Sequence, residues 1–113
     1  MKVHLSANGF ELGSELEKYA DGKAADLYKE IPRPLRADAV CDIQFTQRTV
    51  KRTKISTCTL KLKIGGDEFR AEESTQHMYA ALDIAVVHVE RQLSDHLARK
   101  QSGGRGKGGW QVP

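Results

Sequence analysis

The 113-residue sequence has no long hydrophobic run, and it contains only two cysteines, Cys41 and Cys58. Its apolar stretches are a few residues long, too short for a membrane-spanning helix or for the core of an export signal. Two cysteines are also too few for the disulfide scaffold of a small secreted domain. We therefore expect a cytoplasmic protein with free thiols and no membrane partner.

Acidic residues are missing from one long stretch of the chain. Between Ile43 and Gly66 there is no aspartate or glutamate, although the net charge of the whole chain is only +3. The cations in this stretch are Arg48, Lys51, Arg52, Lys54, Lys61 and Lys63. Such a local positive field suits a polyanion such as a nucleic acid. A solvated hairpin whose lysines prevent edge-to-edge association explains the pattern equally well.

Length and composition indicate one folded domain followed by a tail. The chain has 39% hydrophobic and 29% charged residues, which is ordinary for a folded protein, and its length suffices for one core. The composition becomes glycine-rich from residue 101, which predicts a domain over 1–100 and a flexible tail over 101–113. Arg105, Lys107 and Trp110 could let this tail bind RNA by charge and stacking, and an unselected terminus is the alternative.

The apolar pattern predicts the order strand, helix, three strands, helix. Alternation with a period of two indicates strands over 2–7, 39–46 and 57–64, and around Phe69. Helical spacing of apolar residues indicates helices that end near Ile31 and Leu97. A capping box of Ser14 and Glu17 would start the first helix, and Ser74 or Thr75 would cap the second. A basic turn over 49–53 and a tight turn over 65–67 would join the last three strands.

This order predicts an α+β fold of the type β-α-β-β-β-α. A strand-helix-strand opening makes the first two strands parallel, and the following hairpins are antiparallel, so the four-stranded sheet is mixed. Each strand alternates and each helix has one apolar face. We therefore expect both helices on one face of the sheet, as in double-stranded-RNA-binding domains, with threonine, lysine and arginine on the open face.

The sequence contains no convincing catalytic set. The four histidines are scattered, and the last three lack the i, i+4 spacing of a helical metal site: His4, His77, His88 and His96. Glu72 and Glu73 are adjacent in a strand and so face opposite ways, which is poor geometry for a carboxylate pair. We expect no enzyme activity, no metal or cofactor, and no small-molecule substrate.

Two motifs in the last helix resemble those of a known family. Met-Tyr-Ala-Ala-Leu-Asp at 78–83 follows a strand that ends in acidic residues, and Glu-Arg-Gln-Leu stands at 90–93. Together with the element order over residues 1 to about 100, this pair is similar to the ribosome hibernation-promoting factors, also called ribosome-associated inhibitors or protein Y. The chain stops where long members continue into a dimerisation domain, so it resembles a short-form member.

The resemblance implies a non-enzymatic protein that binds the small ribosomal subunit, alone or in the 70S ribosome, between head and body during stress or stationary phase. There it would overlap the sites of messenger and transfer RNA and silence translation. A general module for structured RNA is the alternative, because helices over a sheet with basic loops can read RNA shape without sequence.

The resemblance also implies that the two helices present cations to ribosomal RNA. The matching positions here are Lys23, Lys29, Arg91, Arg99 and Lys100. The cations of the second hairpin would add phosphate contacts: Arg48, Lys51, Arg52 and Lys54. Tyr79 and His88 are further candidates for RNA contact, although Tyr79 could equally pack against the sheet edge.

Four positions depart from the family pattern. Asp26, His88 and Asp95 stand where members commonly have lysine, and His77 replaces the usual aspartate before Met-Tyr. The helical face is therefore less positive than is typical of the family. The two histidines could strengthen RNA binding at acidic pH, because protonation near pH ~6 adds positive charge.

Overall fold

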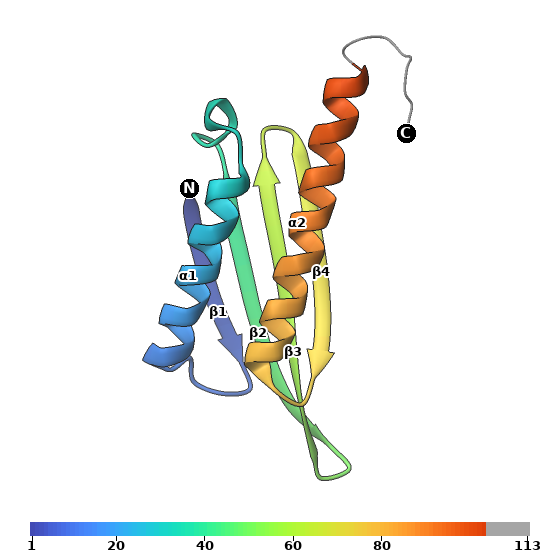
Figure 1. Cartoon of the computed structure of the whole chain (residues 1–113). Helices are drawn as coiled ribbons and strands as arrows, with labels where there is room; N and C mark the ends of the chain where they lie inside the picture. The colour runs from blue at the N-terminus through green and yellow to red at the C-terminus, as the bar shows by residue number, and fades with distance from the viewer. Residues whose placement is uncertain (104–113) are drawn as a thin grey trace.

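Two helices lie across one face of a four-stranded sheet (Figure 1). This computed structural model describes residues 1–103, with side chains through Arg99. The elements are β1 (Lys2–Asn8), α1 (Ser14–Glu30), the 3-10 helix η1 (Arg33–Leu35), β2 (Val40–Val50), β3 (Thr53–Ile64), β4 (Asp67–Thr75) and α2 (Met78–Gly103). Within this range no helix is both long enough and apolar enough to span a membrane. The predicted β-α-β-β-β-α order is confirmed.

The strands follow their chain order across the sheet. β1 pairs with β2 in parallel, and the β2–β3 and β3–β4 pairs are antiparallel. A parallel pair needs a crossover connection, which α1 and η1 supply. Buried residues alternate with less buried ones along β2 as far as Phe45, along β3 from Ser56 and along most of β4, so only one face of the sheet is apolar and both helices cover it. The predicted mixed sheet is therefore confirmed.

The core lies between the sheet and the two helices. From the sheet, Ile43, Phe45, Leu60 and Leu62 are fully buried. The buried helix side chains are Leu16, Ala20, Ala24 and Leu27 of α1, and Met78, Ala81, Leu82, Ala85, Val86, Val89 and Leu93 of α2. Each large apolar side chain buried here contributes roughly 1.5–3 kcal/mol relative to exposure. The predicted apolar stripes of both helices are thus the core.

The start of α1 differs from its prediction. Gly13 is the N-cap residue and makes no side-chain hydrogen bond, so the predicted capping box of Ser14 and Glu17 is wrong. Ser14 is already the first helical residue, one position too late for its hydroxyl to act as the cap. The helix ends at Glu30, before Pro32, as the lost amide of proline requires.

The approach to α2 uses only part of the predicted cap. Ser74 and Thr75 are the last residues of β4, so neither directly caps the helix. The Thr75 hydroxyl accepts a hydrogen bond from the His77 backbone N–H at 2.9 Å. The His77 carbonyl in turn accepts from the Ala81 N–H at 3.1 Å, which closes the first turn of α2. Thr75 therefore stabilises the turn that precedes the helix.

Both antiparallel connections turn within two residues. β2 and β3 are joined by Lys51 and Arg52, which have positive φ angles of 51° and 69°. The basic turn predicted over 49–53 is thus shorter than expected, because the flanking residues belong to the strands. Gly65 and Gly66 join β3 to β4, and the φ of 58° at Gly65 is one that glycine adopts without strain.

The end of α2 lies close to the predicted domain boundary. The helix includes residues 101–103 of the segment that the composition assigned to a tail. Residues 104–113 lie outside the described residues, and the tail candidates Arg105, Lys107 and Trp110 are among them. The side chain of Lys100 also lies outside the described part of the chain.

Candidate nucleic-acid interface

The β2–β3 hairpin projects beyond the rest of the sheet (Figure 1). β1 pairs with β2 only as far as Thr46, and β4 pairs with β3 only as far as Ser56. Residues 47–50 of β2 therefore have sheet partners only in residues 53–56 of β3. We call residues 47–55, which include the turn, the arm.

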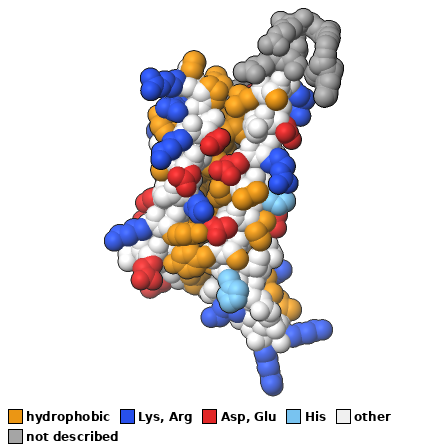
Figure 2. Space-filling view, in the orientation of Figure 1, with side chains coloured by type: hydrophobic (Ala, Val, Ile, Leu, Met, Phe, Trp, Pro, Cys, Tyr) orange, Lys and Arg blue, Asp and Glu red, His pale blue; other side chains and the backbone are white. Residues whose placement is uncertain are grey.

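The arm carries four exposed cations and no acidic residue. Lys51 and Arg52 form its tip. Arg48 and Lys54 belong to neighbouring cross-strand pairs, which point to opposite faces of a hairpin. None of the four forms an ion pair among the described side chains. Figure 2 shows Lys and Arg side chains that project from this end of the molecule. The arm therefore presents unpaired positive charge on both faces and at its tip.

The turn of the arm holds its cations in an unfavourable backbone conformation. The left-handed region costs roughly 1–2 kcal/mol for each residue that is not glycine. Two-residue hairpin turns of this kind normally use Asn-Gly or Asp-Gly for that reason. Lys51 and Arg52 occupy these positions instead, with φ angles of 51° and 69°. This turn therefore places two long cationic side chains at the tip of the arm.

Gly9 fixes the base of the arm. Its φ is +91°, and a Cβ atom at this position would overlap the backbone carbonyl oxygen of Gln47. Glycine therefore lets the chain that leaves β1 lie directly against β2 where the arm begins. The Gln47 side chain donates a hydrogen bond to the hydroxyl of Ser56 at 3.3 Å, and Ser56 is buried. These contacts hold the base of the arm to the folded body.

Lys23 lies in a network that joins the two helices. Its Nζ is 3.2 Å from Asp83 Oδ1 and 5.4 Å from the centre of the Tyr19 ring. The Tyr19 hydroxyl donates a hydrogen bond to the same carboxylate at 2.6 Å. Hydrogen bonding to Asp83 is the main reason that the pKa of Tyr19 and the pKa of Lys23 are raised. The charge of Lys23 is thus already neutralised by a partner on α2.

We expect Asp83→Asn to lower the free energy of unfolding by less than about 1 kcal/mol, because both charged partners are substantially exposed. The raised pKa values of Tyr19 and Lys23 mean that the folded state holds these protons more tightly. The contribution of the network is therefore complete below about pH 10 and declines as the pH rises further. Thermal unfolding of parent and variant from pH 7 to 11 should show a stability difference that shrinks with pH. A difference that grows with pH contradicts this assignment.

Tyr79 packs against α1. Its ring meets the Tyr19 ring edge-on, with 4.9 Å between the centroids. The packing partner is therefore a helix, where the sequence suggested the sheet edge. The side chain is still 42% exposed, which leaves part of the ring accessible for stacking on a base.

The remaining candidate cations of the helices are three exposed side chains. Lys29, Arg91 and Arg99 are exposed and form no ion pair among the described side chains. Figure 2 shows Asp and Glu side chains between the two helices. Burial raises the pKa of Glu90, and the charge of Glu30 raises it further. Acidic side chains therefore interrupt the basic residues of the helices, whereas the arm combines four unpaired cations with no acidic residue.

Both histidines of α2 lie beside carboxylates of β4. His88 Nε2 is 3.8 Å from Glu73 Oε2. His96 Nε2 is 2.9 Å from Asp67 Oδ2, and its ring meets Phe69 edge-on. Each imidazole therefore already has an acidic partner inside the protein. His88 is exposed and remains a candidate for RNA contact.

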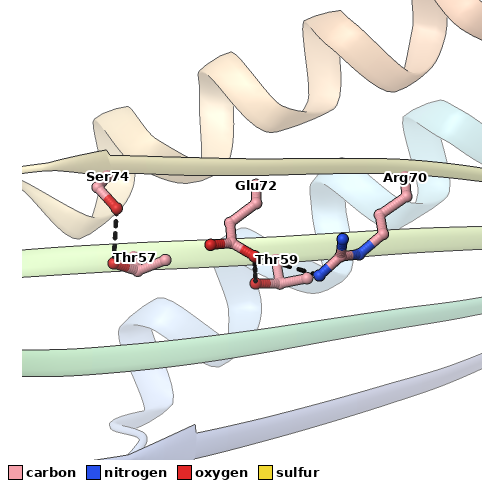
Figure 3. Close-up of polar contacts among 5 residues, drawn as sticks. All are labelled: Thr57, Thr59, Arg70, Glu72 and Ser74. Atoms are coloured by element: carbon pink, nitrogen blue, oxygen red, sulfur yellow. Dashed lines mark hydrogen bonds and ion pairs between the residues drawn. The ribbon is translucent and has the colours of Figure 1, made fainter.

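The open face of the sheet carries polar and charged side chains. The hydroxyls of Thr57 and Ser74 are 2.7 Å apart, and Glu72 accepts from Thr59 at 3.4 Å and from Arg70 at 3.2 Å (Figure 3). In the described strands, no phenylalanine, tyrosine or tryptophan stands at an open-face position. This face therefore lacks the aromatic platform on which sheet-based RNA-binding domains stack bases.

The cysteines are buried and free, as the sequence predicted. Burial raises the pKa of Cys41 and of Cys58 to about 12, so both are thiols rather than nucleophilic thiolates at neutral pH. No group of three or more potential metal ligands occurs among the described residues.

The native protein should resist alkylation of both cysteines by iodoacetamide at pH 8, because each thiol is inaccessible and protonated. In denaturing urea the same reagent should modify both cysteines completely. Mass spectrometry of intact protein counts the adducts in each condition. Rapid addition of two adducts to the native protein would contradict the burial of these strands.

A model of the family described as sigma 54 modulation protein / S30EA ribosomal protein matches residues 3–101 of the chain. The ribosome hibernation promoting factor of Pseudomonas putida is 26% identical over 102 residues, which cover 90% of this chain and 92% of that protein. The protein of the same name from Escherichia coli is 27% identical over 96 residues, which cover 85% of this chain and 93% of that protein. The match thus spans nearly the whole length of both relatives.

Two solved structures share the fold. The N-terminal domain of Thermus thermophilus protein Y matches with a TM-score of 0.68 at 19% identity, over 85% of this chain and 99% of that one. A ribosomal subunit interface protein from Coxiella burnetii matches with a TM-score of 0.67 at 20% identity, over 87% of this chain and 99% of that one. Similarity at this level of identity supports the two-helix, four-strand architecture.

Proposed function

The chain belongs to the sigma 54 modulation protein / S30EA ribosomal protein family, and on that premise we propose that it silences translation by binding the small ribosomal subunit at the decoding channel. The relatives named ribosome hibernation promoting factor support this function. Bound between the head and the body, the protein occupies the paths of messenger and transfer RNA. It acts by occlusion in the cytoplasm, and it carries out no chemical step.

The arm is the observation that supports RNA contact most strongly. Its four unpaired cations project beyond the folded body and can reach phosphates that the body itself does not touch. Phosphate contacts give affinity without base specificity, and the resulting binding weakens as salt rises. Lys29, Arg91 and Arg99 on the helices add further phosphate contacts. Lys23 contributes less, because Asp83 neutralises it.

Sedimentation with purified small subunits and 70S ribosomes through sucrose gradients tests this function. We expect stoichiometric comigration that decreases between a low and a high salt concentration, together with inhibition of cell-free translation. Competition by an excess of plain duplex RNA distinguishes the alternative of a general structured-RNA module, which the duplex would remove from the subunits. Absence of comigration even at low salt would contradict ribosome binding.

A further inference from the structure

β1 is an edge strand whose outer side has no strand partner among the described residues. It stands first in the sheet order and pairs only with β2. The Lys2 backbone N–H donates to the Ala39 carbonyl at 3.1 Å, so the backbone groups of Lys2 point toward β2. Because this direction alternates along the strand, the N–H and C=O groups of Val3, Leu5 and Ala7 point away from the sheet. Each of these three residues therefore offers an unpaired backbone donor and acceptor.

The opposite edge of the sheet, β4, is protected in two ways that β1 is not. The Gln92 side chain accepts a hydrogen bond from the Arg70 backbone N–H at 3.2 Å and donates one to the Arg70 carbonyl at 2.9 Å. β4 also carries charged side chains along its length, whereas the only lysine, arginine or acidic residue of β1 is Lys2 at its start. Covered backbone groups and charged side chains are the usual protection of an edge against strand addition. β1 is therefore the open edge of this sheet.

The apolar side chains of β1 are incompletely covered. Leu5 and Ala7 are half-buried, whereas Ile43 and Phe45, their partners on β2, are fully buried. A groove of ≈ 370 Å³ adjoins the start of β1, and its lining is mostly apolar: Met1, Val3, Asp21, Ala24, Ala25 and Tyr28. A strand added to β1 would cover apolar surface and satisfy the outward backbone groups, which is how strand addition gains affinity.

The sequence of β1 is complementary to a second copy of itself. In an antiparallel pair centred on Leu5, each Leu5 lies opposite the other, Val3 lies opposite Ala7, and His4 lies opposite Ser6. The outward backbone groups of both strands then meet at the Leu5 pair and at the two Val3–Ala7 pairs, as the hydrogen-bonded pairs of an antiparallel ladder require. Apolar side chains meet on the helix-covered face, and the one lysine of each strand lies opposite Asn8, so no like charges are opposed.

We propose that two copies of this chain associate through β1, in the register centred on Leu5, into one continuous sheet with four strands from each copy. The occupant of the open edge is thus a second copy of the chain. One strand pair and the groove beside it make a small contact, so the dimer should be reversible and should depend on protein concentration. This inference goes beyond the proposed function and does not depend on it.

Sedimentation equilibrium of the full chain without ribosomes tests the association. Over protein concentrations from about 1 to about 500 µM, the average mass should rise from the 12.6 kDa of one chain toward twice that value. A parent protein that keeps the mass of one chain at every concentration would overturn the proposal, and the edge would then be left to a strand of another protein.

Two variants that differ only at position 6 test the register. His4→Lys/Ser6→Lys places a cation opposite a cation at both His4–Ser6 pairs, and it should weaken the association by about tenfold. His4→Lys/Ser6→Glu places opposite charges at the same pairs, and it should associate at least as tightly as the parent. Both positions are exposed on the open face of β1, and circular dichroism checks that each variant is folded.

The control for net charge is Gln76→Lys/Ser94→Lys. It adds the same two positive charges at exposed positions, one directly before α2 and one within it. This control should associate like the parent. Equal association of the two position-6 variants would overturn the proposal, because the register then has no effect. Equal weakening in the control and in His4→Lys/Ser6→Lys would also overturn it, since the effect would follow net charge and not the β1 edge.

Discussion

Replacing the four arm cations with glutamine is expected to reduce both ribosome affinity and its salt dependence. In the variant Arg48→Gln/Lys51→Gln/Arg52→Gln/Lys54→Gln, about four phosphate contacts are lost. Each contact contributes roughly 0.7–0.9 to the slope of log affinity against log salt concentration, so the slope should become shallower by about 3–4. Between about 50 and 200 mM salt, the parent should therefore lose about 100-fold more affinity than the variant.

The stability of the arm variant should remain close to that of the parent. The four side chains are exposed and unpaired, and substitutions at such surface positions usually change the free energy of unfolding by less than about 0.5 kcal/mol. Binding isotherms with purified small subunits at several salt concentrations measure the affinity. The matched control replaces four lysines away from the arm with glutamine: Lys2, Lys18, Lys61 and Lys63. Equal losses of affinity in the two variants would contradict a specific role of the arm.

Substitution of Gly9 by alanine should destabilise the fold more than any surface change considered above. The new Cβ would overlap the Gln47 carbonyl oxygen, and the φ of +91° is strained for any residue with a side chain. We expect a loss of about 2–4 kcal/mol in the free energy of unfolding. For a domain of this size, such a loss lowers the midpoint of thermal unfolding by roughly 10–20 °C.

Gly22 provides the matched control for this prediction. It lies in the middle of α1, and an added Cβ would meet no heavy atom within 4 Å. Gly22→Ala should therefore raise the free energy of unfolding by about 0.5–1 kcal/mol, because alanine favours the helix. Calorimetry of the two variants under identical conditions compares the effects. A Gly9→Ala protein as stable as the parent would contradict the close approach of the chain at the base of the arm.

The fold was largely predictable because its strands and helices have regular apolar patterns. Alternation in β2 and β3 assigned Cys41, Ile43, Leu60 and Leu62 to the buried face, where all four lie. Helical spacing likewise identified the buried stripes of α1 and α2. These patterns are strong because a shift of one residue in a strand would move every apolar side chain to the open face.

The helix ends and the arm were predicted less well because they depend on backbone geometry. Gly13 has no side chain to signal that it is the N-cap of α1. The arm continues as paired strands to Val50 and from Thr53, where polar residues give no alternating pattern. The left-handed turn at Lys51 and Arg52 was not anticipated either, because neither residue type favours that conformation.

Contacts between elements that are far apart in the sequence account for the remaining differences at the site. The sequence singled out Lys23 as an RNA-binding cation, but it could not reveal that Asp83, far along the chain, is its partner. Tyr19 was not recognised, although its i, i+4 spacing from Lys23 places both on the same face of α1. Gly9 could be read only as the end of the first strand and not as a close approach to Gln47, because a glycine after a strand is common at any turn. These contacts arise only when separate elements meet.

Cryo-electron microscopy of 70S ribosomes saturated with the protein is the most direct test of the central claim. The account predicts density for the two-helix, four-strand domain between the head and the body of the small subunit, in the path of messenger and transfer RNA. The arm should lie within contact distance of ribosomal RNA phosphates. Density at any other site, or an arm that points into solvent in the bound state, would contradict the account.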